Sequence, residues 1–321
     1  MEKIMRICPI CGDNQSAVKY KNCLYDDRYG YKGYYSLVKC GQCGHGWLDA
    51  KFKPEEIEAL YTNFYPRSTL KLDSYKPSSN ADGFLAWLDG KASSTHCYVP
   101  PNVRVLDIGC GFCETLGYHS ARGCDVYGVE ADANVLNIAE KKGFKVHNGL
   151  FDPEVYQHNF FDFITLNQVI EHAQEPLQML EGISRILKKG GSVVIGTTNS
   201  NSFFARILGR FWLHWHAPYH LQQFSDKSMS IAASKCGLEM ERFLTLTHSD
   251  WLYYQQIHFF VRPVEGVPAA FWSEQGKCGF IAKVALKLLP YFHKTRINHI
   301  ITRLLDFLGY GDSYLFILRK L

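Results

Sequence analysis

The sequence lacks the features that define several classes of protein. No apolar stretch approaches the roughly 18 residues of a membrane-spanning helix, and the first nine residues have no apolar core of a signal peptide. The net charge is only +4 over 321 residues, and 21% charged residues accompany 46% apolar ones. This balance indicates neither disorder nor strong binding of nucleic acid. We therefore expect a folded cytoplasmic protein of about two domains, at roughly 150 residues per domain.

Cysteine is scarce as well, and its distribution is uneven. Eleven cysteines in 321 residues are far below the about 8–10% of a disulfide-stabilised secreted chain, so paired cysteines are interpreted first as metal ligands. A redox function is less consistent with the pattern, because neither pair lies at a helix start in a βαβ unit. Cys23 and His45 remain alternatives for one ligand. Two C-x-x-C turns, each followed by glycine, predict a structural four-cysteine Zn²⁺ site formed by Cys8, Cys11, Cys40 and Cys43.

The order of apolar and polar segments divides the chain into three parts. Residues 1–50 are expected to form a zinc-ribbon domain, and residues 51–99 a linker with lid helices, including a helix at 54–61. From residue 100 to 321, short apolar runs alternate with helical stretches, which predicts an α/β fold with a doubly wound, Rossmann-like sheet. Insertions are expected at about 199–225 and 248–312.

The boundaries of the elements follow from the same alternation. Glycines are expected to end two of the helices: Gly143 ends one, and Gly190-Gly191 ends another. The expected strands are 103–108, 125–130, 144–147, 161–166, 192–197, 238–247 and 313–319, and the expected helices are 134–142, 176–188 and 226–236.

A glycine turn follows the first of these strands and indicates a ligand. Asp107 stands two residues before Gly109 and four before Gly111, and Glu130 ends the next strand. A carboxylate at that place can accept both hydroxyls of a ribose. An acid just before the glycines repels phosphate but suits the ammonium group of S-adenosylmethionine (SAM), so SAM fits this loop better than NAD.

At this point the chain resembles the class I SAM-dependent methyltransferases. The motifs at 103–111, 128–130, 161–172 and 186–191 occur in that family's order and spacing. The resemblance is closest to enzymes related to ubiquinone-biosynthesis O-methyltransferases and to sugar methyltransferases with an N-terminal zinc-binding domain. It implies a seven-stranded sheet whose last strand, 313–319, is antiparallel.

The resemblance also implies which residues bind SAM. The glycine loop would hold the methionine end of SAM, and Glu130 would bind its ribose. Gly149 and Leu150 would lie beside the adenine. Asn167 and Gln168 would line the methionine side. Cys113 stands where the family usually has glycine. The complete set is Asp107, Gly109, Cys110, Gly111, Glu130, Gly149, Leu150, Asn167 and Gln168.

Histidines follow the ends of two strands, where doubly wound sheets place their ligands. An alcohol acceptor needs a base for methylation, and imidazole titrates in the useful range. The first candidate for this base is His220, which lies in a P-x-H-L-x-x-F stretch that resembles the family; His172 is the second and His216 the third. A weaker hypothesis is that His214, His216 and His220 bind a second metal ion. Hydrogen bonding within a half-buried loop is the alternative for each ring. Six aromatic residues near these histidines and in the linker are expected to form a pocket for the acceptor, and packing in the core is the alternative: Tyr61, Phe64, Tyr65, Trp212, Trp215 and Tyr219.

The C-terminal part contains a basic, apolar segment. From Lys277 to Arg303 there are six Lys or Arg and no Asp or Glu, with apolar residues at helical spacing through residue 308. Residues 277–308 therefore suit a membrane surface or a lipid-linked acceptor. Packing on the sheet or on a second subunit is the alternative.

These features predict a SAM-dependent methyltransferase that O-methylates a hydroxyl of a small-molecule or glycan acceptor, as in polysaccharide biosynthesis, with histidine as base. C-methylation of a nucleotide-linked sugar is the alternative reaction. A zinc-ribbon module that binds nucleic acid or protein, with a non-catalytic SAM fold, is the alternative of another class. Nucleic acid is disfavoured because the cysteine turns do not lie in a dense basic patch.

Overall fold

The computed structural model describes residues 7–65, 75–133 and 136–321. These ranges leave out most of the first nine residues, part of the linker expected at 51–99, and the first two residues of the helix expected at 134–142.

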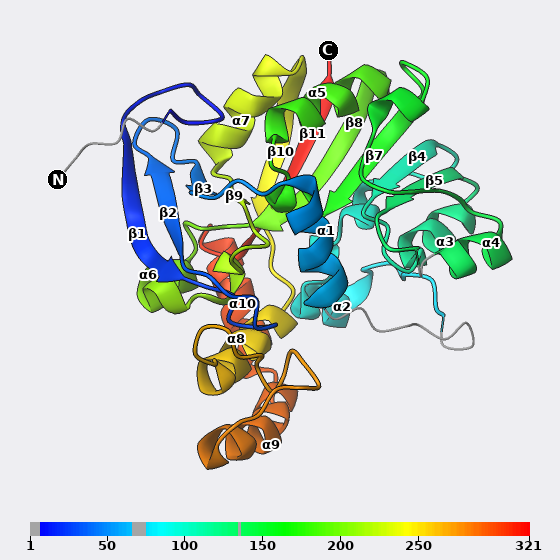
Figure 1. Ribbon diagram of the computed structural model, residues 1–321. Helices are drawn as coiled ribbons and strands as arrows, with labels where there is room; N and C mark the ends of the chain where they lie inside the picture. The colour runs from blue at the N-terminus through cyan, green and yellow to red at the C-terminus, as the bar shows by residue number, and fades with distance from the viewer. Residues whose placement is uncertain (1–6, 66–74, 134–135) are drawn as a thin grey trace.

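A seven-stranded sheet forms the centre of the molecule (Figure 1). Its first five strands are parallel, as the sequence predicts, and the last strand of the chain lies antiparallel between its two neighbours, as the resemblance implies. The spatial order is β6 (Lys145–Asn148), β5 (Asp125–Glu130), β4 (Arg104–Ile108), β7 (Phe161–Asn167), β8 (Leu187–Thr198), β11 (Ser313–Lys320) and β10 (Leu238–Thr245).

Helices cover both faces of this sheet, as the alternation of side chains along β4 shows. Val105 packs in one cluster with residues of α3 (Glu114–Ser120) and α4 (Leu136–Lys142). Leu106, the next residue, packs in another cluster with residues of α5 (Pro176–Ile186) and α7 (Asp226–Lys235). Because neighbouring residues of a strand point to opposite faces, the two helix pairs lie on opposite sides. The sheet is therefore doubly wound, as expected.

One predicted boundary is wrong. The helix expected to reach residue 188 ends at Ile186, and β8 begins at Leu187, so Gly190 and Gly191 lie within the strand rather than closing the helix. Leu187 pairs with Phe161, whereas Ser192 already pairs with Phe163. The extra residues form a bulge, which Gly190 allows with φ +75°.

The N-terminal cysteine segment forms a second, four-stranded sheet. The strands β1 (Ser16–Leu24), β2 (Tyr35–Cys40) and β3 (Gly46–Leu48) are antiparallel neighbours. The fourth strand, β9 (Gln222–Gln223), comes from the segment that carries His220 and pairs with β3. The cysteine segment is therefore paired with a part of the chain that is about 175 residues away in the sequence.

The remaining elements lie mostly below the sheet in Figure 1. They are the helices α1 (Pro54–Asn63), α2 (Gly83–Asp89), α6 (Phe203–Leu208), α8 (Asp250–Val261), α9 (Phe280–Lys294) and α10 (Ile297–Phe307), and short 3₁₀ turns at 91–93, 95–98, 153–155, 170–172, 209–211 and 213–215. The helix α9 projects from the body (Figure 1). None of the helices in the described residues combines the length and the apolar character needed to cross a bilayer.

Candidate functional site

At two positions of the glycine loop after β4, the backbone has a conformation that only glycine tolerates well. Gly109 has φ +75°, and a Cβ there would lie 2.6 Å from Cγ2 of Val169, in the loop after β7. Gly111 has φ +52°, and a Cβ there would meet nothing within 4 Å. The loop is thus closely covered on one side and open on the other. Cys113 also has positive φ, +62°, directly before α3, which explains why glycine suits this position.

Two carboxylates flank this loop. Asp107 is buried at 3% exposure, and its Oδ1 accepts a hydrogen bond of 2.6 Å from the Thr165 hydroxyl, while Thr115 donates to its other oxygen. Burial raises the pKa of Asp107 to about 6. Glu130, at the end of β5, accepts backbone N–H bonds from Gly111 (3.1 Å) and Asp132 (3.0 Å). The Glu130 carboxylate is therefore fixed beside the open glycine.

The other predicted cofactor residues divide into two groups. Gly149, with φ +144°, donates its N–H to the Glu130 carbonyl (2.9 Å) and leaves Leu150 73% exposed next to this acid. Asn167 is exposed at the end of β7, and the Gln168 N–H bonds the Gly196 carbonyl of β8 (2.8 Å). These residues gather at the carboxyl ends of adjacent strands. Cys110 instead packs in the core that faces α3.

The predicted catalytic histidines lie beside each other. The rings of His172 and His220 are 4.8 Å apart in an edge-to-face arrangement, and His216 lies 4.9 Å from His220. The backbone links the two segments, since the Leu221 N–H donates to the Glu171 carbonyl (2.8 Å). The structure therefore brings the end of β7 and the segment after β8 together.

The protonation of His220 follows from its hydrogen bond. Its Nδ1 lies 2.9 Å from the backbone carbonyl of His214. A carbonyl only accepts, so Nδ1 carries the hydrogen and Nε2 carries the lone pair. Burial, together with the nearby His172 and Arg28, holds the pKa of His220 well below its usual range. His220 is therefore a neutral imidazole.

Glu171 joins this cluster, and sequence reasoning had assigned it no role. Its side chain is fully buried, one oxygen accepts from Thr197 (2.8 Å) and the other has no hydrogen-bond partner in the described residues. One donor atom each from Glu171, His172 and His220 lies within 4.8 Å of the others. Burial raises the pKa of Glu171 to about 7. The set can share a proton or hold a cation. The Glu-His pair was visible in the sequence, but its burial was not.

Aromatic rings form one wall beside these histidines. The hydroxyl of Tyr61, in α1, is hydrogen-bonded to His172 Nδ1 at 2.9 Å. The centroids of the Tyr61 and Tyr219 rings are 5.7 Å apart. Tyr65 lies 5.5 Å from Tyr219, and Tyr29 lies 5.5 Å from the same ring. His216 stacks on Tyr219 at 4.7 Å. Three of the predicted pocket residues are therefore brought together, with Tyr29 as an unpredicted fourth.

Other predicted pocket residues lie elsewhere. Trp212 and Trp215 belong to a core cluster with Leu24 and Leu37 of the N-terminal sheet. The Trp212 Nε1–H donates to Asp312 (3.0 Å), and the Trp215 Nε1–H donates to the Gly209 carbonyl. Both are core residues, which was the alternative considered from the sequence. Phe64 packs on Tyr31, with ring centroids 5.0 Å apart.

The four predicted metal ligands do meet. The Sγ atoms of Cys8 and Cys43 are 3.7 Å apart, those of Cys11 and Cys40 are 3.6 Å apart, and all four lie within 4.8 Å of each other. Sulfurs around a tetrahedral Zn²⁺ at about 2.3 Å would be separated by about 3.8 Å. His45 is not part of the cluster: it is fully buried, and its Nε2 contacts Gln222 Oε1 at 3.0 Å.

The cysteine cluster also contacts the segment that follows His220. The Ser225 hydroxyl donates to the Cys43 carbonyl (2.6 Å), and Lys227 donates to the Gln42 carbonyl (2.7 Å). From α7, Lys235 donates to the Ile10 carbonyl (2.6 Å). The turns that carry the cysteines are thus attached to Ser225 and to α7.

The sheet order, the glycine loop and the acid after the second parallel strand define the class I SAM-dependent methyltransferase architecture. Residues 52–242 match the family described as a methyltransferase domain, which is more than half of the chain. The chain belongs to this methyltransferase domain family. Enzyme class and fold are thereby as the sequence predicts, and the interpretation as a non-catalytic binding module loses support.

Individual relatives are more distant. A segment of 107 residues is 35% identical to an uncharacterized protein of Methanocaldococcus jannaschii. The match covers 33% of this chain and only half of that protein. The ubiquinone biosynthesis O-methyltransferase of Thiobacillus denitrificans is 25% identical over 229 residues, which is 66% of this chain and 86% of that enzyme. A SAM-dependent methyltransferase structure from Thermotoga maritima superimposes with a TM-score of 0.44 at 21% identity, over 74% of this chain and 89% of that one.

Proposed function

We propose that the protein binds SAM at the glycine loop and methylates a hydroxyl group of a small-molecule or glycan acceptor. The fit of SAM rests on the chain itself. Gly111 leaves open space, Glu130 presents a fixed carboxylate beside it, and Leu150 exposes an apolar side chain at the same edge. The acid Asp107 under the loop disfavours a phosphate group, as NAD would require.

When bound, SAM supplies an electrophilic methyl group on a sulfonium. The chain would orient the acceptor, and Nε2 of His220 would accept the hydroxyl proton while the carbon–sulfur bond of SAM breaks and neutral S-adenosylhomocysteine leaves. The single observation that supports this role is the His220–His214 hydrogen bond, because it leaves the lone pair on Nε2 of a neutral ring. Glu171 and His172 each place a donor atom within 4.8 Å of one on His220, so the proton can pass to either.

The aromatic wall supports a flat or sugar-like acceptor. Tyr61, Tyr65 and Tyr219 present rings next to the histidines, and such rings pack on planar rings and on the apolar faces of sugars alike. Tyr219 is buried and Tyr61 and Tyr65 are half-buried, so the wall limits the access of water to the reacting groups. C-methylation of a nucleotide-linked sugar uses the same wall and the same base, so it remains the second candidate.

His220→Asn tests the base. An asparagine amide can still donate to the His214 carbonyl, but it has no basic nitrogen at the Nε2 position. We expect turnover to fall by about 10²–10⁴-fold with unchanged affinity for S-adenosylhomocysteine. His158→Asn, at an exposed position, is the matched control. Full turnover in H220N would remove this residue from the mechanism.

The reaction type is tested with SAM carrying a ¹³C-labelled methyl group and a panel of phenolic, glycan and nucleotide-sugar acceptors. A methyl carbon attached to oxygen resonates far downfield of one attached to carbon. Turnover of protein that retains about one zinc per chain, measured without and with an added divalent cation, shows at the same time whether the Glu171, His172 and His220 set works without a second cation.

We propose that Zn²⁺ occupies the four-cysteine cluster. Four protein ligands leave no open coordination position, so the ion is structural rather than catalytic. The sulfur separations support this assignment. Zinc content by mass spectrometry should be about one per chain in freshly purified protein.

A further inference from the structure

The C-terminal helices expose apolar side chains to an unusual extent. On α9, Phe280 is 81% exposed, Ile281 72% and Tyr291 65%. On α10, Phe307 is 87% exposed and Ile300 61%. Contiguous exposed apolar surface of this kind marks an interaction site.

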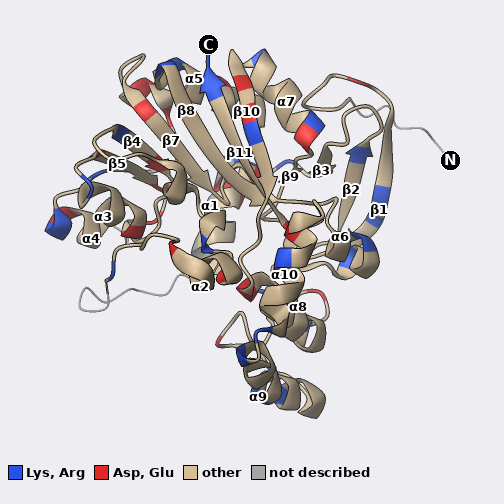
Figure 2. Ribbon diagram, turned by 180° about the vertical axis from the view of Figure 1, so that it is seen from behind, with Lys and Arg blue, Asp and Glu red and all other residues tan. Residues whose placement is uncertain are grey.

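The helix α9 divides into three faces. Its inner face carries Ala282, which packs with Ile257 and Val261 of α8. Away from this contact, one stripe is apolar and contains Phe280, Ile281, Val284, Leu288 and Tyr291. At 100° per residue, the neighbouring stripe consists of lysines at 283, 287 and 294. Figure 2 shows basic and no acidic residues on α9.

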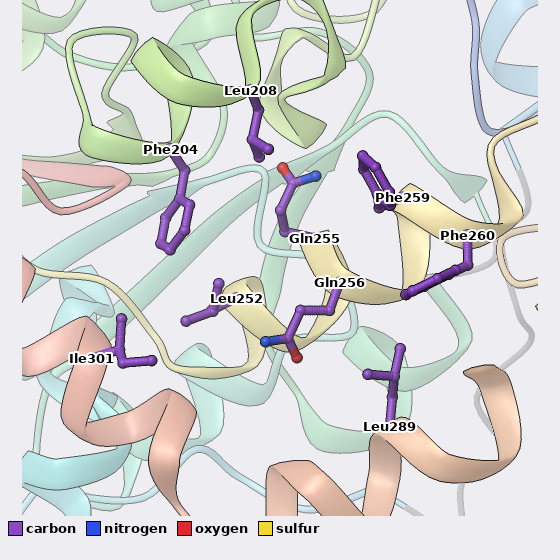
Figure 3. Close-up of a pocket in the computed structure, with 9 residues that line it drawn as sticks. All are labelled: Phe204, Leu208, Leu252, Gln255, Gln256, Phe259, Phe260, Leu289 and Ile301. Carbon is purple, nitrogen blue, oxygen red and sulfur yellow. The ribbon is translucent and has the colours of Figure 1, made fainter.

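Two apolar grooves adjoin these stripes. One, of about 350 Å³, lies between α6, α8, α9 and α10, and Figure 3 shows Leu252, Gln255 and Gln256 of α8 between the side chains of Leu208 and Leu289. The second, of about 330 Å³, lies between Phe260 of α8 and the apolar stripe of α9. The exposed surface thus continues from α9 onto α8, and Ile301 extends it to α10.

We propose that this surface docks on an anionic membrane, with α9 lying in the plane of the lipid headgroups. The apolar stripe would enter the headgroup boundary while the lysines remain in contact with anionic lipid, the arrangement typical of interfacial helices. Fifteen residues span only about 22 Å, too short for a hydrocarbon core of about 30 Å.

The charges favour a membrane over a second copy of this chain. From 277 to 303 the sequence has six basic and no acidic residues. A two-fold contact through this face would place the lysine stripes of both copies near each other, which costs free energy. Arg303 is buried against Asp306 and Arg296 pairs with Asp89, but the four lysines of this segment are exposed. An anionic bilayer attracts each of these lysines by about 1 kcal/mol, which is about fivefold in binding.

The docking surface is also attached to the catalytic segment. Gln255 lines the larger groove, accepts a hydrogen bond from the Leu213 N–H (2.7 Å) and donates to the Phe211 carbonyl (3.2 Å). The next residue of that segment, His214, holds the ring of His220. A membrane-bound protein would therefore present this segment close to the bilayer.

Vesicle flotation of the full-length protein tests the proposal. Vesicles of phosphatidylcholine with about a third phosphatidylglycerol should carry the protein upward, whereas pure phosphatidylcholine should carry far less, and high salt should release it. Lys283→Gln/Lys287→Gln should lower binding by about thirtyfold. Phe280→Ser/Leu288→Ser should lower it on both types of vesicle. The matched controls are Lys189→Gln and Phe243→Ser, both at exposed positions outside this surface.

S-adenosylhomocysteine binding serves as the check on folding, and it is independent of the docking. All variants should retain it. Flotation that is absent, or that is equal for variants and wild type, would overturn the proposal. So would a dimer in light scattering that disappears in F280S/L288S, because the occupant would then be a second copy.

Discussion

At the scale of single residues, the site is organised by carboxylates in different surroundings. Glu130 is held at a strand end by the backbone N–H groups of Gly111 and Asp132. Asp107 and Glu171 are buried with hydroxyl partners, and burial raises the pKa of each. The positions of Asp107 and Glu130 could be predicted, since both follow from strand order. The involvement of Glu171 could not, because it depends on the contact between two segments about fifty residues apart.

Glu130→Gln should weaken binding of S-adenosylhomocysteine by about ten- to hundredfold, because hydrogen bonds to a charged group contribute about 1.5–3 kcal/mol. Isothermal titration calorimetry measures this directly. Glu140→Gln, an exposed acid of α4, should leave the affinity unchanged. Equal affinity in E130Q would show that the ribose is bound elsewhere.

Asp312 gives a pH dependence of stability. It is buried, accepts hydrogen bonds from Ser202 (2.5 Å) and Trp212 (3.0 Å), and burial raises its pKa to about 6. The raised pKa means that the protein loses stability as the pH rises from the ordinary carboxyl value through about 6. Asp312→Asn keeps an acceptor oxygen but removes the charge.

The decrease in unfolding free energy between about pH 4 and about pH 8 should be smaller in D312N than in wild type by about 2–3 kcal/mol. Denaturant titrations at several pH values measure it. The exposed Glu239→Gln should keep the wild-type profile. An unchanged profile in D312N would mean that Asp312 titrates normally.

At the scale of elements, hydrophobic alternation was sufficient to predict the seven strands of the central sheet. It failed at residues 187–191, because the bulge depends on pairing with β7, which no local pattern encodes. It also gave no sign that Gln222 and Gln223 complete the N-terminal sheet, since two residues carry no period. Both misses arise from long-range pairing.

The contacts of Ser225 and α7 with the cysteine turns predict that zinc supports catalysis from a distance. Cys43→Ser should lower zinc content, lower the melting temperature and reduce turnover by about a hundredfold, because a displacement of about 1 Å at the reacting groups is that costly. Cys23→Ser is the matched control and also tests the alternative ligand. Normal turnover of zinc-free C43S would contradict this coupling.

At the scale of the whole molecule, the cysteine sheet, the methyltransferase sheet and the C-terminal helices meet around one segment, residues 213–224. That segment carries His220, forms β9 and bonds Gln255 of α8. The sequence indicated each part separately through its cysteines, its glycine loop and its basic helices. Their convergence could not be predicted, because the 213–224 segment has few regular elements and its place depends on packing from three sides.

The central claim is that the glycine loop binds SAM and its product S-adenosylhomocysteine, nucleosides that carry an amino-acid group, and not a pyrophosphate. Isothermal titration calorimetry of the wild-type protein with S-adenosylhomocysteine and, separately, with NAD tests it most directly. The structure predicts saturable binding of one S-adenosylhomocysteine per chain and no heat with NAD, since Asp107 lies under the loop. Binding of NAD in place of S-adenosylhomocysteine, or of neither, would contradict the assignment.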